Sequence, residues 1–194
     1  MTVVVNFNAI SIKNSSVQMH IADGTKADGT KFGSVGSVEG KTTTRELIKR
    51  EEGVEVKKRT KPEKMDLTIS AHVPVQVVRD IFGLSNEDLN PGVYKYSKEA
   101  KGKEFTYTAD VIDEFEDVTK LIAFPRCTSS TGFKFTVTNG ADEVAEMEVE
   151  ITVYPDEQGN LYYEAIVDEL DELSTVPTTW HTQFIYTLVE LPAV

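Results

Sequence analysis

The side chains of this chain that could take part in chemistry are one cysteine, three histidines and many carboxylates. Cys127 lies in a stretch, residues 124–130, that is typical of a turn, and this favours a bystander thiol over a reactive nucleophile. His20, His72 and His181 are far apart, whereas metal sites need clustered donors. We therefore expect surface or hydrogen-bonding roles for the histidines, and no metal site.

Carboxylates gather in two runs, at residues 113–117 and 168–172. Paired acids can act in glycoside hydrolysis, and loop acids can bind calcium. Neither run has the glycine-centred spacing of a calcium loop, so a solvated or interface surface is the favoured interpretation. These runs therefore predict no acid pair and no calcium site.

Residues 36–42 resemble a phosphate-binding loop, but three residues instead of four separate the first glycine from Gly-Lys-Thr. No Gly-x-Ser-x-Gly nucleophile elbow occurs in the chain. Because no catalytic constellation is present in the sequence, we expect a protein that is not an enzyme and that needs no cofactor.

A third group of acids has strand spacing. Glu146, Glu148 and Glu150 alternate with apolar residues, and side chains two apart on a strand line one face. The row is either an outer, solvated face or a negative wall past which DNA slides without sticking. The second interpretation makes these three residues candidates for lining a DNA channel.

The overall composition limits the class of protein. The chain has 194 residues and a net charge of −12, which argues against a protein that coats nucleic acid. One cysteine excludes an intrachain disulfide and suits a reducing cytoplasm. No apolar run approaches the roughly 18 residues of a membrane span, and the N-terminal residues predict no signal peptide.

Charge is distributed unevenly along the chain. Residues 41–64 carry nine bases and five acids, whereas residues 104–194 carry three bases and nineteen acids. The basic segment and the acidic second half are thus complementary. Beyond solubility, this pattern suggests that the basic segment of one copy meets an acidic surface of another.

Alternation of apolar and polar residues is the dominant structural signal, and it predicts antiparallel sheets packed face to face. Asn139-Gly140 and residues 155–160 are turn signals, which predict two hairpins in series from about 131 to 169. The predicted strands are residues 67–73, 105–111, 133–137, 145–153 and 184–189.

One helix is predicted over residues 75–82, between Pro74 and a C-terminal glycine at Gly83. Residues 42–52 are β-branched or charged, so an exposed long hairpin or loop is favoured there over a helix. Asp23-Gly24-Thr25-Lys26 recurs as Asp28-Gly29-Thr30-Lys31. We interpret residues 20–35 as an exposed, mobile loop.

Several stretches between residues 60 and 190 resemble the major tail proteins of siphophages and prophages of Gram-positive bacteria. The order and spacing of these stretches carry the resemblance more than any one of them does. They are residues 61–70, Phe82-Gly83, 92–96, 104–105, 120–125, 132–135, 143–146, 169–172 and 180–184.

The resemblance implies a mainly β, tail-tube-type β-sandwich or barrel with one flanking α-helix and a long extended loop or hairpin. Residues 1–194 would then form one tail-tube domain with an N-terminal arm and a protruding basic segment at 41–64. In such proteins six copies form a ring, and stacked rings make a hollow tube through which genomic DNA passes without sequence-specific binding.

Partners and location also follow from the resemblance. The chain would bind itself, a tape measure protein inside the tube during assembly, and tail terminator and distal tail proteins at the ends. It would be found in the virion tail, and in the cytoplasm of the bacterial host during assembly, with no membrane contact. Candidates for contact between rings are Arg45, Lys49, Arg50, Lys57, Lys58 and Arg59.

Three alternatives stay open. A tail terminator or a capsid decoration protein could share such a sandwich, but neither would polymerise into long cylinders. A carbohydrate-binding β-sandwich would want several exposed aromatic side chains on one face, and Trp180, the only tryptophan, is expected to anchor packing instead. An acid-based hydrolase lacks a paired motif.

Overall fold

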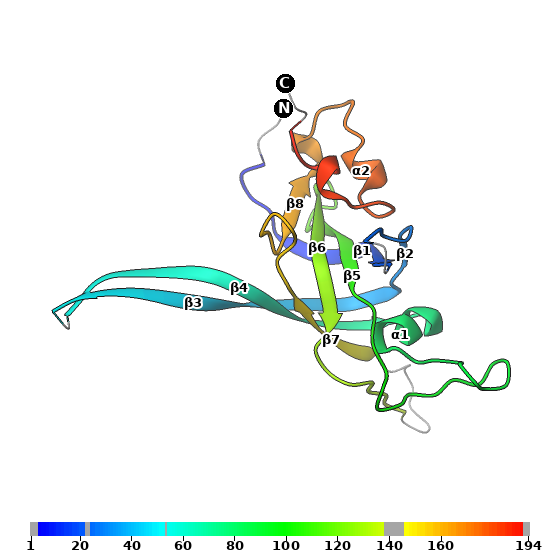
Figure 1. Ribbon diagram of the computed structural model, residues 1–194. Helices are drawn as coiled ribbons and strands as arrows, with labels where there is room; N and C mark the ends of the chain where they lie inside the picture. Colours follow the sequence, from blue (N-terminus) through cyan, green and yellow to red (C-terminus); the bar gives the residue numbers. More distant parts are fainter. Residues whose placement is uncertain (1–3, 22–23, 53, 138–145, 192–194) are drawn as a thin grey trace.

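The computed structural model describes residues 4–21, 24–52, 54–137 and 146–191 (Figure 1). Its strands form one antiparallel sheet in the order β2-β1-β5-β6-β7-β4-β3. The eighth strand, β8, is not in this order and pairs with β6. The strands are β1 Ala9–Met19, β2 Thr30–Lys31, β3 Ser34–Glu51, β4 Val54–His72, β5 Phe105–Asp113, β6 Thr119–Ser129, β7 Met147–Val153 and β8 Tyr163–Ile166. The helices are α1 Val75–Phe82 and α2 Val176–Thr179, with 3-10 turns at Val167–Glu169 and Tyr186–Leu188.

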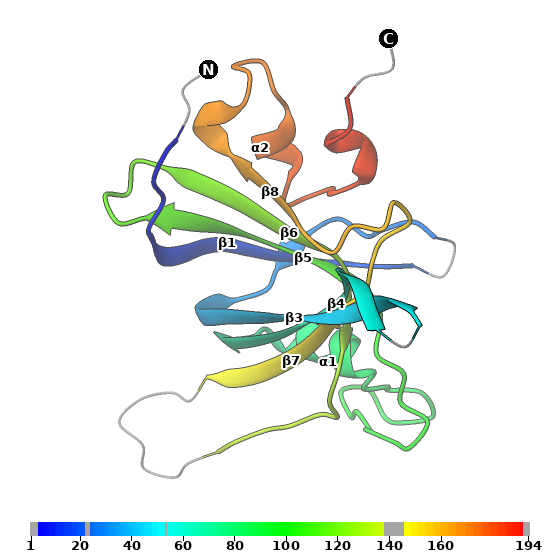
Figure 2. The same cartoon turned by 90° about the vertical axis from the view of Figure 1, so that its left-hand side faces the viewer.

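Strand β6 joins two layers of this sheet. One of its edges pairs with β5, and its other edge pairs with β8 over residues 120–123 and with β7 over residues 127–129. The sheet bends at this point, so that β1, β5, β6 and β8 lie above β3, β4 and β7 in Figure 2. Residues 155–160 were predicted to turn a hairpin, which is wrong, because the flanking strands β7 and β8 both pair with β6.

The main core lies between the two layers. Fully buried Val17, Phe105 and Tyr107 from one layer face Ile69 and Ile151 from the other. Helix α1 adds its apolar side chains to the same core: Val77, Val78, Ile81 and Phe82. This arrangement confirms the predicted β-sandwich with a flanking helix.

The local signals for α1 are confirmed. Pro74 is the N-cap residue, and its fixed φ of −58° suits a helix start. Gly83 ends the helix with φ 71° and donates its backbone N–H to the carbonyl of Arg79. A left-handed residue at this position is usually glycine, since a Cβ would clash there. The predicted strands within β4, β5 and β7 are confirmed as well.

A second apolar cluster covers the outer face of β6. It contains Leu121, Ala123, Trp180 and Phe184, and the indole N–H of Trp180 donates to the carbonyl of Ile122 at 3.0 Å. The segment that supplies Trp180 and Phe184 also covers the polar side of β5, where Thr108 and Asp110 are buried and contact His181. Residues 184–189 were predicted to be a strand, which is wrong: they form an extended residue followed by the Tyr186–Leu188 turn.

The segment after β6 also differs from its prediction. Residues 133–137 were predicted to be a strand, but they pair with no strand among the described residues. Phe133 instead packs edge-on against Phe82 of α1, at 5.6 Å between ring centroids, and stacks on Phe135. Only Phe133 packs against the core, whereas Phe135 and Val137 are largely exposed, so the alternation here does not mark a strand with one buried side. The predicted turn at Asn139-Gly140 lies outside the described residues.

Residues 24–35 pack on the body in places. They contain β2, a fully buried Phe32 and Gly29, whose N–H donates to the carbonyl of Thr182 at 2.8 Å. A Cβ on Gly29 would lie 1.8 Å from the carbonyl oxygen of His181, so the close approach requires glycine. The mobility expected for residues 20–35 stays a prediction.

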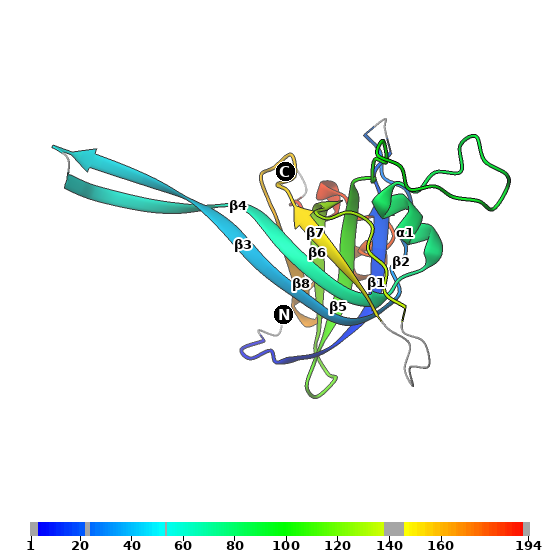
Figure 3. The same cartoon turned by 90° about the horizontal axis from the view of Figure 1, so that it is seen from below.

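Strands β3 and β4 extend far beyond the sandwich. They pair with each other from Ser34↔His72 to Glu51↔Val54, whereas β7 pairs with β4 only from Met65 to Ala71. Residues 41–64, which we call the arm, are therefore a two-stranded ribbon that projects into solvent (Figures 1 and 3). The preference for a hairpin over a helix at 42–52 is confirmed.

The packing of Trp180 gives a stability prediction. Trp180 is 1% exposed, packs in the second apolar cluster and donates one hydrogen bond. Because Trp180→Ala removes these contacts, we expect it to destabilise the fold by about 3–5 kcal/mol. Urea unfolding followed by circular dichroism measures this change. Leu173→Ala is the control, since Leu173 is 95% exposed and its loss should cost no more than about 0.5 kcal/mol. Equal midpoints for the two variants would contradict the anchoring role.

Candidate functional site

The arm has one strongly basic face, and the pairing register defines it. Directly opposed residues of antiparallel strands project to the same side. The cross-strand pairs on this side are Arg45↔Lys61, Leu47↔Arg59 and Lys49↔Lys57. We call Arg45, Lys49, Lys57, Arg59 and Lys61 the basic face.

The opposite side of the arm is nearly charge-balanced. Lys58 donates to Glu46 at 2.7 Å, and this hydrogen bond raises the pKa of Lys58. Ile48 lies across from Lys58 on the same side. The two faces of the ribbon thus differ: one carries bases and Leu47, the other an ion pair and Ile48.

The register sorts the six residues suggested by sequence. Arg45, Lys49, Lys57 and Arg59 come together on the basic face, whereas Lys58 lies on the other side and Arg50 sits opposite Glu55 near the tip. Lys61 was missed by sequence reasoning, because charge density along the chain does not show which residues share a side. The arm also exposes four aliphatic side chains: Leu47, Ile48, Val54 and Val56.

The carboxylate row lies on the outside of the second layer. Val149, Ile151 and Val153 of β7 are fully buried, so the alternate residues Glu148 and Glu150 point away from the core. The Glu146 carboxylate lies against Gly36 of β3, where a Cβ would approach it to 2.5 Å. The structure therefore brings the three predicted residues to one surface.

Register extends this surface across the sheet. Glu150 lies opposite Thr68 of β4, and Thr68 lies opposite Glu39 of β3, which is exposed. Glu39 was not among the residues singled out from sequence, since only the order of strands places it near β7. We call Glu39, Glu146, Glu148 and Glu150 the acidic face.

One cation of the same chain touches the acidic face. Lys134 donates to Glu148 at 3.1 Å and lies 3.9 Å from Glu150. All three side chains are about half exposed, at 55%, 54% and 40%. The hydrogen bond to Glu148 is the main cause of a raised pKa for Lys134. Exposed pairs of this kind contribute little stability, so the contact can be exchanged at small cost.

A groove of about 710 Å³ opens between β1 and β3. In the described chain, residues 9–12 of β1 pair only with β5, and residues 35–40 of β3 pair only with β4. Both rims of the groove are therefore free sheet edges. Its lining is largely apolar and includes Ile12, Val38, Leu67, Ile122 and Phe124.

A histidine that sequence reasoning placed in a surface or hydrogen-bonding role ties the C-terminal segment to β5. His181 Nε2 bonds Asp110 Oδ1 at 2.7 Å, and its Nδ1 bonds Thr108 Oγ1 at 3.0 Å. Asn14 donates to the other Asp110 oxygen at 2.6 Å. The order hydroxyl–imidazole–carboxylate resembles a hydrolytic triad, but Thr108 is fully buried and out of reach of a substrate. The network acts as a polar anchor.

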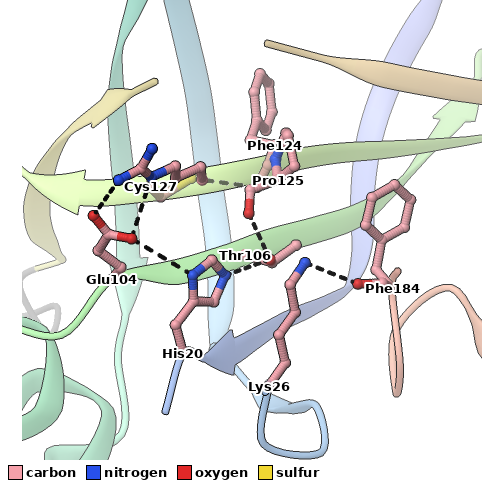
Figure 4. Close-up of polar contacts among 9 residues, drawn as sticks. His20, Lys26, Glu104, Thr106, Phe124, Pro125, Cys127 and Phe184 are labelled. Carbon is pink, nitrogen blue, oxygen red and sulfur yellow. Dashed lines mark hydrogen bonds and ion pairs between the residues drawn. The ribbon is translucent and has the colours of Figure 1, made fainter. Parts of the chain in front are cut away.

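A second polar network surrounds His20 (Figure 4). Thr106 donates to the carbonyl of Pro125 at 2.7 Å, so it accepts from His20 Nε2, at 3.0 Å. His20 Nδ1 lies 3.7 Å from Glu104, which accepts two hydrogen bonds from Arg126. These bonds from Arg126 are the main cause of a lowered pKa for Glu104.

Burial is the main cause of a lowered pKa for His20, and the nearby Lys26 lowers it further, while Glu104 opposes both. Lys26 donates to the carbonyl of Phe184 at 3.0 Å, and burial lowers its pKa too. Two bases are thus held close together where solvent is partly excluded. Lys26 thus ties the β1–β2 connection to the C-terminal segment, and His20 ties it to the start of β5.

Other reactive groups are accounted for by packing. Burial raises the pKa of the Cys127 thiol well above its usual range, and the thiol donates to the carbonyl of Phe124. In the described part of the chain, no three His, Cys, Asp or Glu side chains are grouped so that they could hold a metal ion. No helix in residues 4–21, 24–52, 54–137 or 146–191 is long and apolar enough to cross a membrane.

Comparisons with known proteins were made by sequence and by structure. No protein-family model and no curated protein sequence matches the chain. Among solved structures, the chain is similar to one described as a cryo-EM structure of the anti-feeding prophage cap, the tube terminating cap. The two are 10% identical with a TM-score of 0.45, over 85% of this chain and 95% of the other.

The His20 network predicts a pH dependence of stability. Because the pKa of His20 is lowered from 6.5 on folding, the unfolded chain binds the proton more readily. Stability is therefore full above pH 6.5 and declines as the pH falls below it. In His20→Gln this part of the decline should disappear, since glutamine does not titrate.

Urea midpoints at pH 7 and pH 5 measure the effect. The wild-type protein should lose more stability between these pH values than His20→Gln does. His72 and His181 are present in both proteins and cancel in the comparison. Identical losses would show that His20 is protonated equally well in the folded and unfolded states.

Proposed function

We propose that this chain is a structural protein of a phage tail that assembles with copies of itself into stacked rings, forming the tail tube. The resemblance of residues 60–190 to major tail proteins suggests this role and a ring of six. In this proposal the protein is not an enzyme, and DNA passes through the tube without being recognised.

The observation that carries the proposal is the arm. Two-stranded ribbons without a third strand or a covering helix are only marginally stable in water. The arm nevertheless extends from the sandwich with exposed aliphatic side chains and a basic face. A surface of this kind is explained if a partner covers it in the working assembly.

Ring closure has candidate edges in the same molecule. The free edge of β3 and the free stretch of β1 at residues 9–12 are different surfaces, as a ring requires: each copy must offer one surface and accept with another. Pairing of such edges between neighbours would also remove them from aggregation. We propose that edge pairing closes the rings and that the arm connects one ring to the next.

The inner surface of the tube belongs to the same proposal. Glu146, Glu148 and Glu150 share one exposed face, as a channel lining would need, and repulsion of phosphates would ease DNA passage. Their place in the lumen stays a prediction. The tape measure protein inside the tube and the terminator and distal tail proteins at its ends also stay predicted partners, as does a location in the virion tail.

A second candidate function has one observation in its favour. Tyr96, Phe133 and Phe135 form an aromatic cluster near α1, with Tyr96 and Phe135 half or more exposed. A carbohydrate-binding sandwich presents such side chains to sugars. Here, however, Phe133 and Phe135 stack on each other. The guanidinium carbon of Arg79 lies 3.6 Å from the ring centroid of Tyr94, so few aromatic faces stay open. Binding of the purified protein to cell-wall glycans would favour this candidate.

The proposal predicts the result of reversing charge on the arm. Lys57→Glu/Lys58→Glu/Arg59→Glu should block tube growth and leave the monomer folded, because the arm is exposed and contributes nothing to the core. Negative-stain microscopy of concentrated protein shows tubes, and circular dichroism reports the fold. Wild-type protein should form long hollow cylinders under the same conditions.

A matched control has the same change in net charge elsewhere. Lys31→Glu/Lys98→Glu/Lys101→Glu reverses three exposed lysines outside the arm and should still form tubes. Tubes of normal length from the arm variant would refute the role of the arm in stacking. A terminator or a decoration protein would differ from a tube protein already in the wild type, by stopping at a single ring.

A further inference from the structure

We infer that the acidic face of one copy is the docking site for the basic face of another copy's arm. This inference rests on the proposed self-assembly and names the partner surface for the arm. It replaces the proposed lumen role of Glu146, Glu148 and Glu150, because a face covered by an arm does not line a channel. Both faces are exposed, both are built on strands, and they carry opposite charge.

The spacing of the charges matches. Side chains two apart along a strand repeat about every 6.7 Å, whichever strand carries them. Glu148 and Glu150 follow this repeat on β7, and Glu146 directly precedes the strand. Lys57, Arg59 and Lys61 follow the same repeat on β4. When the arm lies along β7, several opposite charges can therefore meet at once, and their attraction favours this surface over uncharged ones.

The contact must be between copies. The arm points away from its own sandwich, and its pairing with the body through β3 and β4 is continuous (Figures 1 and 3). Residues 41–51 extend about 35 Å at the rise of a strand, which is enough to reach across a neighbouring sandwich. Because the basic face and the acidic face are different surfaces, each copy can bind one neighbour with its arm and another with its acidic face. The contact can therefore repeat from ring to ring.

Lys134 marks where the arm's cations would bind. It already contacts Glu148 and Glu150 from within the chain, at 3.1 and 3.9 Å. An incoming lysine or arginine would replace an exposed ion pair with one that is covered by the arm and shielded from salt. We infer that Lys134 acts as a placeholder that the arm displaces.

A charge swap tests the docking. Glu148→Lys/Glu150→Lys should stop tube growth, and adding Lys57→Glu/Arg59→Glu to the same chain should restore it, because the pairs reform with reversed signs. Asp171→Lys/Glu172→Lys is the matched control, since it reverses two exposed acids elsewhere and should grow tubes normally. Circular dichroism confirms that each variant is folded, and electron microscopy measures tube length.

The outcomes separate this inference from the proposed function. Wild-type protein that never forms tubes overturns the proposed function itself. Normal tubes from wild type and from Glu148→Lys/Glu150→Lys overturn the docking site, while self-assembly stands and the carboxylates stay candidates for the lumen. Failure of the four-residue swap to regain growth also overturns the pairing.

A second variant avoids charge reversal at the acidic face. Lys134→Ala removes the placeholder and leaves all four glutamates, so the lowest protein concentration that supports tube growth should fall several-fold. Light scattering across a concentration series measures it. A concentration that is unchanged or higher would overturn the placeholder role of Lys134.

Discussion

Backbone hydrogen bonds of a sheet need partners on both sides of each strand, and the arm lacks them on its outer sides in the described chain. Within the sandwich β4 lies between β3 and β7, but β7 pairs with it only as far as Met65. Beyond Met65 the ribbon has two open edges and no core beneath it. The sandwich therefore satisfies its own strand pairing and packing, whereas the arm does not.

The body shows the completeness that the arm lacks. Two apolar clusters fill it, and among the described residues every buried side-chain nitrogen or oxygen atom has a hydrogen-bond partner. His181 is central to this, because its bonds to Asp110 and Thr108 allow the polar side of β5 to be covered. Burying the Asp110 carboxylate without its bonds to His181 and Asn14 would be costly in free energy.

Sequence predicted the elements whose causes are local. Pro74 and Gly83 delimit α1, and alternation in β4, β5 and β7 reflects one apolar side facing the core. The sequence-based predictions were wrong where a segment's structure depends on residues far away in the chain. The turn at 155–160 looks like a hairpin, but β6 offers one long edge on which β7 and β8 bind in succession. Residues 184–189 alternate like a strand, yet Phe184 packs into the cluster of Trp180 instead.

The candidate surfaces show the same limit. Composition alone indicated a basic 41–64 and a carboxylate row at 146–150, and both are exposed as expected. Which charges share a face depends on register, which no local signal determines. Register adds Lys61 to the basic face and leaves Lys58 with Glu46 on the other side. It also adds Glu39 to the acidic face, although more than one hundred residues separate it from β7.

The charge on the arm also solves a problem that its open edges create. An exposed ribbon with aliphatic side chains would pair with any similar ribbon, and natural proteins often prevent this with lysine along such edges. Two arms of this chain repel each other through their basic faces, whereas an arm and an acidic face attract. In the proposed assembly, the same five cations would suppress contact between arms and favour contact between an arm and a body. That asymmetry would favour an ordered, directional polymer over an aggregate of hairpins.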